Sequence, residues 1–191
     1  WNARNFRLME AKDGNESDRA KWQELLPHRD DAFVGDFAVF KHFVAVGERS
    51  GGLGKIRIRP WSGGKDSFIA ADDPTYTFSL GANHEVDTDL VRYTYESLAT
   101  PPSTFDFNAR TGERTLLKRE AVLGKFDPAE YATEFLWATA RDGTKVPVSL
   151  VYRRGVKRDG TAPLLQYAYG SYGSSTDPWF QLEALSLLDR G

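Results

Sequence analysis

Short runs of alternating apolar and polar residues cover most of the first 118 positions, and Gly, Pro, Asp and Asn separate one run from the next. In the run "KIRIRPW", Ile56 and Ile58 share one face of an extended chain. Arg57 and Arg59 take the other face, which predicts a strand with one face buried and one face in water.

The spacing of these runs predicts an all-β region. The stretch "FDFNARTGERTLL" reads as a hairpin whose turn is Asn-Ala-Arg-Thr-Gly. Strands recur at intervals of roughly 8 to 12 residues without a helical period between them, which is typical of a β-sandwich or a β-propeller. Two units, 33–71 and 75–118, have about the length of one propeller blade. Their sequences are only weakly alike, so the pattern alone leaves a sandwich open.

The pattern changes after residue 118. In "LGKFDP", Gly124 and the pair Asp127-Pro128 interrupt regular secondary structure, which indicates a segment that connects two domains. We therefore predict β-propeller blades over 1–118, a linker over 119–130 and a second domain over 131–191.

The second domain is expected to begin with strands. Asp142 and Gly143 stand between two β-rich runs, which is a strong signal for a hairpin. Pro147 cannot donate to a strand ladder, so it indicates an exposed edge. A further strand is predicted over 163–170, "PLLQYAYG".

A helix is predicted at the end of the sequence. Leucines 182, 185 and 188 follow Trp179 at intervals of three, and Asp177-Pro178 is a good helix start. Strands followed by a helix indicate the beginning of an α/β domain.

Composition limits the partners. The chain has 191 residues, 40% of them hydrophobic, and a net charge of -2, so it can bury a core and lacks the basic surface that nucleic acid needs. It contains no run of about 18 apolar residues and no signal-peptide pattern, so we expect no membrane partner. The absence of Cys fits a reducing compartment, and the cytoplasm is the predicted location.

One stretch, "HEVDTD" from His84 to Asp89, could be read as a metal site because an imidazole and three carboxylates lie close together. Loops between strands are commonly acidic, and we favour a solvated loop. No metal and no cofactor are predicted.

The stretch "YAYGSYG" holds three tyrosines and two glycines between an apolar run and the predicted helix. In α/β-hydrolases part of the oxyanion hole lies between a strand and a helix in this way. A Tyr hydroxyl is neutral near pH 7 and can donate a hydrogen bond to the negative charge that forms during acyl transfer. Alternatively, the rings cover a domain interface.

The stretches "VRYTYESLATPPSTFDFNARTGERTLLKR", "RDGTKVPVSLVYRRG" and "APLLQYAYGSYG" together resemble the prolyl oligopeptidase family of serine peptidases, and within it the oligopeptidase B branch. The resemblance covers nearly the whole chain and is weakest over 1–70. It implies a mostly β chain with a partial α/β region: the last blades of a seven-bladed β-propeller, followed by the first strands and helix of an α/β-hydrolase domain.

The resemblance also implies roles for residues of the tyrosine loop. The second tyrosine of the family's loop is the oxyanion donor, and it corresponds to Tyr169. Ser171 and Tyr172 are expected to bind substrate. Ala168 stands where the family usually has glycine, a change too small to displace Tyr169.

A serine peptidase also needs a G-x-S-x-G elbow, followed by an Asp and a His. The sequence has no such elbow and no histidine beyond His84; His28 and His42 also lie in the β-rich part. The resemblance therefore implies a fragment of an enzyme that cleaves short peptides after Lys or Arg. The fragment itself is predicted to be inactive and prone to self-association through unpaired sheet edges.

Two other functions stay open. One is a non-catalytic β-propeller module that binds peptides or partner proteins. The other is a related acylaminoacyl peptidase or esterase that uses the same loop. A G-x-S-x-G, an Asp and a His further along the parent reading frame would favour the peptidase over the module.

Overall fold

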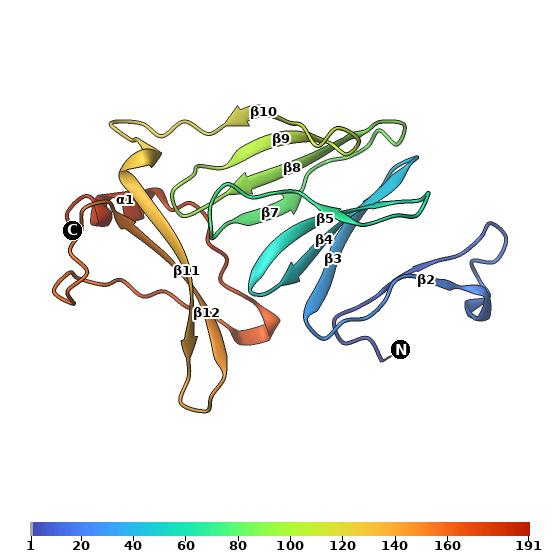
Figure 1. Ribbon diagram of the computed structural model, residues 1–191, viewed down its shortest axis with the longest axis horizontal. Coiled ribbons are helices and arrows are strands. Elements are labelled where there is room, and N and C mark those ends of the chain that lie inside the picture. The colour runs from blue at the N-terminus through green and yellow to red at the C-terminus, as the bar shows by residue number, and fades with distance from the viewer. Residues whose placement is uncertain (1) are drawn as a thin grey trace.

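Antiparallel sheets make up most of the computed structural model, which describes residues 2–191 (Figure 1). The strands are β1 (Leu8–Glu10), β2 (Gln23–Leu26), β3 (Ala32–Val39), β4 (Phe43–Ser50), β5 (Leu53–Pro60), β6 (Ser67–Phe68), β7 (Thr77–Leu80), β8 (Leu90–Glu96), β9 (Ser103–Asn108), β10 (Arg114–Arg119), β11 (Tyr131–Thr139) and β12 (Lys145–Arg153). The helix α1 (Leu182–Leu188) and the 3₁₀ turns η1 (Arg19–Lys21), η2 (Pro128–Glu130) and η3 (Ser171–Gly173) complete the list. No helix in this described part has the length and apolar character needed to cross a membrane.

Two four-stranded sheets form the centre of the molecule. Their strand orders are β3-β4-β5-β6 and β10-β9-β8-β7, so each strand pairs with its neighbour in sequence. Such four-stranded antiparallel sheets have the form of propeller blades. The two units expected at 33–71 and 75–118 are confirmed, and we call them the first and second blade.

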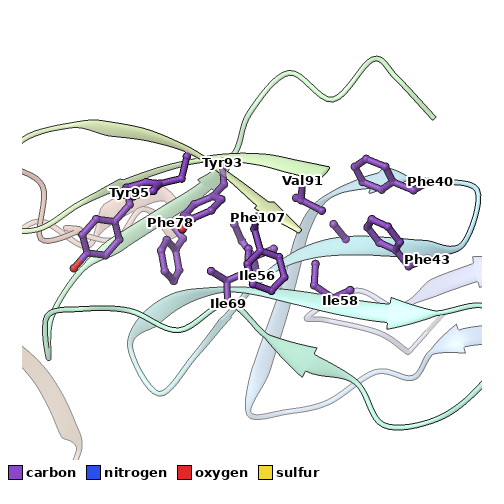
Figure 2. Packing of buried hydrophobic residues seen from close by; sticks show 12 residues of the cluster. Phe40, Phe43, Ile56, Ile58, Ile69, Phe78, Val91, Tyr93, Tyr95 and Phe107 are labelled. Carbon is purple, nitrogen blue, oxygen red and sulfur yellow. The ribbon is translucent and has the colours of Figure 1, made fainter. Parts of the chain in front are cut away.

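The two blades share one apolar core (Figure 2). Ile56 and Ile58 of the first blade are almost fully buried, as the alternation predicts. In the second blade, Tyr93 stacks on Phe105 with ring centroids 5.5 Å apart and meets the edge of Phe78 at 5.4 Å. Aromatic pairs in these geometries add to the free energy gained by burying their area. The core therefore fixes one blade against the other.

The prediction that Arg57 faces water is wrong. The opposite face of the first blade is also covered, because an apolar cluster joins it to the β1-β2 hairpin; the cluster comprises Leu26, Val34, Val44 and Val46. Arg57 is buried there and binds Glu48 at 2.8 Å and Asp66 at 2.7 Å. Arg29 donates to the same Glu48 at 2.9 Å. The buried charges are thus paired, as burial requires.

Both predicted hairpin turns are confirmed. Between β9 and β10, the Asn108 side chain accepts hydrogen bonds from two amides of the turn, and Gly112 has a φ of 78°. Between β11 and β12, the Asp142 carboxylate accepts from a backbone amide two residues ahead, and Gly143 has a φ of 86°. Pro147 lies in β12, which pairs only with β11 within residues 2–191, as the expected edge position requires.

The second region departs from its prediction in two places. The segment 163–170 forms no strand, because no strand of the described chain lies beside it, and Leu164 and Leu165 are exposed. Helix α1 is present but starts at Leu182, four residues after Pro178. Asp177 does not cap the helix, since its carboxylate binds Arg49 instead. The described residues contain a hairpin and a helix here, but no parallel sheet.

The charge pairing on the covered face of the first blade can be tested by Glu48→Gln. The Glu48 side chain is only 2% exposed, so the variant keeps the shape and removes the buried negative charge between two arginines. We expect the free energy of unfolding, measured with urea, to fall by about 3 kcal/mol, because Arg57 loses part of its compensation.

Asp106→Asn is the matched control, because Asp106 pairs with the half-exposed Arg92, which water can solvate. Asp106→Asn should lower the free energy of unfolding by much less than Glu48→Gln. Equal losses in the two variants would contradict the importance of burial.

Candidate functional site

The tyrosine loop, Tyr167–Gly173, turns the chain sharply between the segment after β12 and helix α1 (Figure 1). Tyr172 has a φ of 59° and Gly173 a φ of 71°, so two successive residues are left-handed. Glycine adopts this conformation freely, whereas a tyrosine does so only under constraint. The amide of Ser174 donates to the Ser171 carbonyl at 3.0 Å and closes the turn.

Thr176 fixes the backbone of Tyr169. Its hydroxyl accepts a hydrogen bond from the Tyr169 amide at 3.0 Å and donates to the Tyr169 carbonyl at 3.3 Å. A hydroxyl can do both because it carries a donor and two lone pairs. The loop is therefore held by polar contacts at the residue that the sequence singled out.

The phenol of Tyr169 is accessible in the described part of the chain. Tyr169 is 53% exposed, and within residues 2–191 its hydroxyl has no hydrogen-bond partner. Tyr172 is 99% exposed, and Ser171 is exposed as well. Tyr167 is also exposed, so none of the three rings is buried against the described part of the chain. The backbone brings the three predicted site residues together on one exposed turn.

Two polar contacts from the blades hold the segment that follows the loop. Asp177 forms a bidentate ion pair with Arg49 at the end of β4, with N–O distances of 2.6 and 2.7 Å. The amide of Phe180 donates to the Glu96 carboxylate in β8 at 2.8 Å. Sequence reasoning missed Arg49 because it lies 128 positions from Asp177 and no local pattern connects them.

A small apolar cluster joins the blades to the rest of the second region. Ala99, Tyr131 and Leu185 are its buried members. The Tyr131 hydroxyl donates to the Asp189 carboxylate at 2.7 Å, just beyond α1. Burial and this bond raise the pKa of Tyr131 to about 12, so the phenol stays a neutral donor at physiological pH. Helix α1 is thus fastened to strand β11.

The β11-β12 hairpin also contacts the first blade. Gly52, in the turn between β4 and β5, has a φ of 84°, and a Cβ placed there would lie 2.7 Å from the Cβ of Pro147. Only glycine fits both the conformation and the space. The hydroxyls of Thr75 and Ser149 form a second, short contact between the blades and the hairpin.

The acidic stretch from His84 to Asp89 does not gather its carboxylates around one point. Lys41 binds Asp87 at 2.7 Å and, chiefly through this hydrogen bond, holds the pKa of Asp87 below its usual value. Arg110 binds Asp89 at 2.9 Å. Across residues 2–191 no three His, Asp or Glu side chains are grouped so that they could hold a metal ion.

A hollow of about 370 Å³ lies in the N-terminal region, away from the tyrosine loop in sequence. Residues of β1 and of the segments around it line the hollow, namely Ala3, Phe6, Arg7, Met9 and Trp22. Its lining includes no residue of the tyrosine loop and no Ser, His or Asp that could form a catalytic triad. We therefore take the loop as the candidate site.

Comparison with known proteins shows the family. Residues 1–120 match the family described as "Prolyl oligopeptidase, N-terminal beta-propeller domain". The chain is 48% identical over 190 residues to dipeptidyl aminopeptidase BI of Pseudoxanthomonas mexicana, covering 99% of this chain and 26% of the relative. It is 35% identical over 189 residues to Protease 2 of Moraxella lacunata, covering 99% of this chain and 27% of the relative.

Solved structures of the same family have a similar fold. Oligopeptidase B from Leishmania major superimposes with a TM-score of 0.84 at 34% identity, over 98% of this chain and 27% of that one. Oligopeptidase B from Trypanosoma brucei with covalently bound antipain gives 0.78 at 32% identity, over 88% of this chain and 25% of that one. The chain belongs to the prolyl oligopeptidase family, as its sequence indicated. It spans about a quarter of the length of these relatives.

The role of Thr176 in holding the loop can be tested with Thr176→Val, which keeps the shape of the side chain and removes the hydroxyl. Both hydrogen bonds to the Tyr169 backbone are lost, so the Tyr169 amide should exchange its hydrogen faster. Hydrogen–deuterium exchange followed by mass spectrometry of a peptide spanning 167–176 measures this.

Thr161→Val is the control, since the Thr161 hydroxyl also makes a local bond, to Asp159, outside the loop. It should leave exchange over 167–176 unaltered. Unchanged exchange in Thr176→Val would show that the hydroxyl does not hold the loop.

Proposed function

We propose that this chain is part of a serine peptidase that hydrolyses short peptides, with Tyr169 as a donor in its oxyanion hole. The observation that carries the proposal is the exposed Tyr169 phenol, without a partner in residues 2–191, on a turn whose backbone is hydrogen-bonded to Thr176. Membership of the prolyl oligopeptidase family supports it. In this proposal 1–118 are propeller blades, 119–130 a linker and 131–191 the start of an α/β-hydrolase catalytic domain.

The proposed chemistry needs a donor aimed at a developing charge. When a serine attacks the peptide carbonyl, its oxygen becomes negative, and a hydrogen bond that strengthens at this moment lowers the barrier. Tyr169 supplies that bond from its phenol hydroxyl, while Ser171 and Tyr172 on the same turn contact the peptide. The attacking serine and its Asp and His are not recognisable in this sequence, so the chain alone is proposed to be inactive.

The proposed substrates are short peptides cleaved after Lys or Arg, in the cytoplasm. The resemblance to the oligopeptidase B branch supports the specificity, together with the likeness to two oligopeptidase B structures. The absence of Cys supports the location.

A second candidate is a dipeptidyl aminopeptidase, which removes two residues from a free N-terminus. The observation that favours it is the 48% identity to dipeptidyl aminopeptidase BI over 99% of this chain. Both candidates use the same oxyanion donor and differ in how the peptide N-terminus is recognised.

Tyr169→Phe tests the oxyanion role in the complete natural protein that carries these residues. The variant removes one hydroxyl that interacts most strongly in the transition state, so kcat should fall roughly 10²- to 10³-fold while KM changes little. Steady-state kinetics with a fluorogenic peptide measures both constants.

Tyr167→Phe is the matched control, because Tyr167 is also exposed in the same loop and has no proposed role. Its kcat should equal that of the unaltered protein. If Tyr169→Phe also keeps full turnover, Tyr169 is not the oxyanion donor.

The two specificities predict different substrates. A peptide with a blocked N-terminus and Arg before the scissile bond should be hydrolysed by an oligopeptidase of the proposed kind. Replacing that Arg by uncharged citrulline should lower kcat/KM, because the peptide loses its positive charge. Hydrolysis restricted to a substrate in which a dipeptide with a free N-terminal amine is joined to a fluorogenic amine would favour the second candidate. Comparison of kcat/KM for the three substrates decides between them.

A further inference from the structure

The part of the chain that the structure describes provides no apolar packing to orient the tyrosine loop. Within residues 2–191, positions 161–175 are all exposed, so no burial against this part of the chain fixes the direction of the loop. A catalytic donor nevertheless has to be held close to its productive geometry, because a displacement of about 1 Å can cost roughly 10²-fold in rate. Among the described residues, the contacts that can orient the loop are therefore the polar ones at its end.

Arg49 is the polar contact best placed to supply it. It lies in the inner strand β4, where its backbone pairs with Phe33 of β3 and Gly54 of β5. Both terminal nitrogens of its guanidinium bind the Asp177 carboxylate, with N–O distances of 2.6 and 2.7 Å. A bidentate Arg–carboxylate pair fixes the orientation of the carboxylate as well as its distance from the guanidinium. Asp177 is thereby tied to a strand that is paired on both sides within the first blade.

The constraint on Asp177 reaches Tyr169 in two steps. Asp177 directly follows Thr176, and the Thr176 hydroxyl binds both the amide and the carbonyl of Tyr169. One peptide bond and one pair of hydrogen bonds thus connect the anchored carboxylate to the backbone that carries the phenol. Moving Asp177 would move Thr176, and with it the Tyr169 backbone.

Neighbouring contacts confine the same segment. Pro178 is buried, and the Phe180 amide donates to Glu96 of the second blade at 2.8 Å. The segment after the loop is therefore held by one residue from each blade. The Glu96 contact lies further from Tyr169 than the Arg49 contact, so Arg49 has the more direct effect on the loop.

We propose that Arg49 is a positioning residue for catalysis: through Asp177 and Thr176, the first propeller blade sets the orientation of the Tyr169 phenol. This inference rests on the proposed function. It gives the blades a part in the chemistry, because the residue that aims the oxyanion donor belongs to a different part of the fold from the donor itself.

The test compares Arg49→Ala in two backgrounds of the complete natural protein. In the unaltered background kcat should fall on the order of 10-fold with KM little changed, because the interaction affected is made in the transition state. In the Tyr169→Phe background the same substitution should have no further effect on kcat, because the hydroxyl that Arg49 positions is already absent. A merely structural role would lower kcat in both backgrounds.

Arg92→Ala is the matched control. Arg92 forms an equally bidentate pair with Asp106, at 2.9 and 2.9 Å, on the second blade and away from the loop. It should leave kcat unchanged in both backgrounds. Asp177→Ala should match Arg49→Ala, and the double variant should lose no more than either single variant, since each removes the same pair.

Hydrogen exchange gives a second readout that does not depend on turnover. In Arg49→Ala the peptide spanning 167–176 should exchange faster, while peptides of β8 and β9 should exchange as before.

The outcomes separate the two proposals. If Tyr169→Phe lowers kcat but Arg49→Ala has no effect, or has an equal effect in both backgrounds, the positioning role of Arg49 is overturned and the oxyanion role stands. If Tyr169→Phe leaves kcat unaltered, the oxyanion role is overturned, whatever Arg49→Ala does.

Discussion

Face-to-face packing of the two blades is the interaction on which the other features depend. Sheets pack this way only when each presents a continuous apolar face, and here Ile56 and Ile58 of β5 meet aromatic rings of β8 and β9 (Figure 2). Tyr93 and Phe105 are stacked within this layer. Because the rings interlock, the first and second blade have a fixed relative orientation. Every contact that reaches from the blades to the second region starts from this rigid base.

Covering the second face of the first blade has a chemical consequence. The β1-β2 hairpin packs on that face, so charged side chains that a half-buried strand would leave in water become enclosed. Burying an unpaired charge is very unfavourable, and Arg57 is stable there because Glu48 and Asp66 lie beside it. Packing on both faces is what neighbouring blades of a propeller require, and the buried ion pairs accompany it.

The candidate site follows a different physical rule. Within residues 2–191 the tyrosine loop is exposed throughout, and the contacts that this part of the chain makes with it are hydrogen bonds and one ion pair rather than apolar burial. Thr176 fixes the Tyr169 backbone, and Arg49 fixes the residue after Thr176. Within residues 2–191 this arrangement leaves the phenol accessible while its backbone is constrained, as the proposed oxyanion role requires.

The sequence by itself determined the strands of the two blades and the two hairpin turns, because these depend on residues close together in the chain. Alternation placed Ile56 and Ile58 in the core, and Asp142 with Gly143 specified a hairpin, since side-chain period and turn conformation are local properties. Three stretches of sequence, one of them around Tyr169, together indicated the family, which the comparisons confirmed. Only the tertiary structure decided what covers each face and what each polar group binds: that Arg57 is buried, that 163–170 has no neighbouring strand, and that Asp177 pairs with Arg49 instead of starting a helix. Such contacts join positions as far as 128 residues apart, and they depend on how the sheets pack, which no local pattern records.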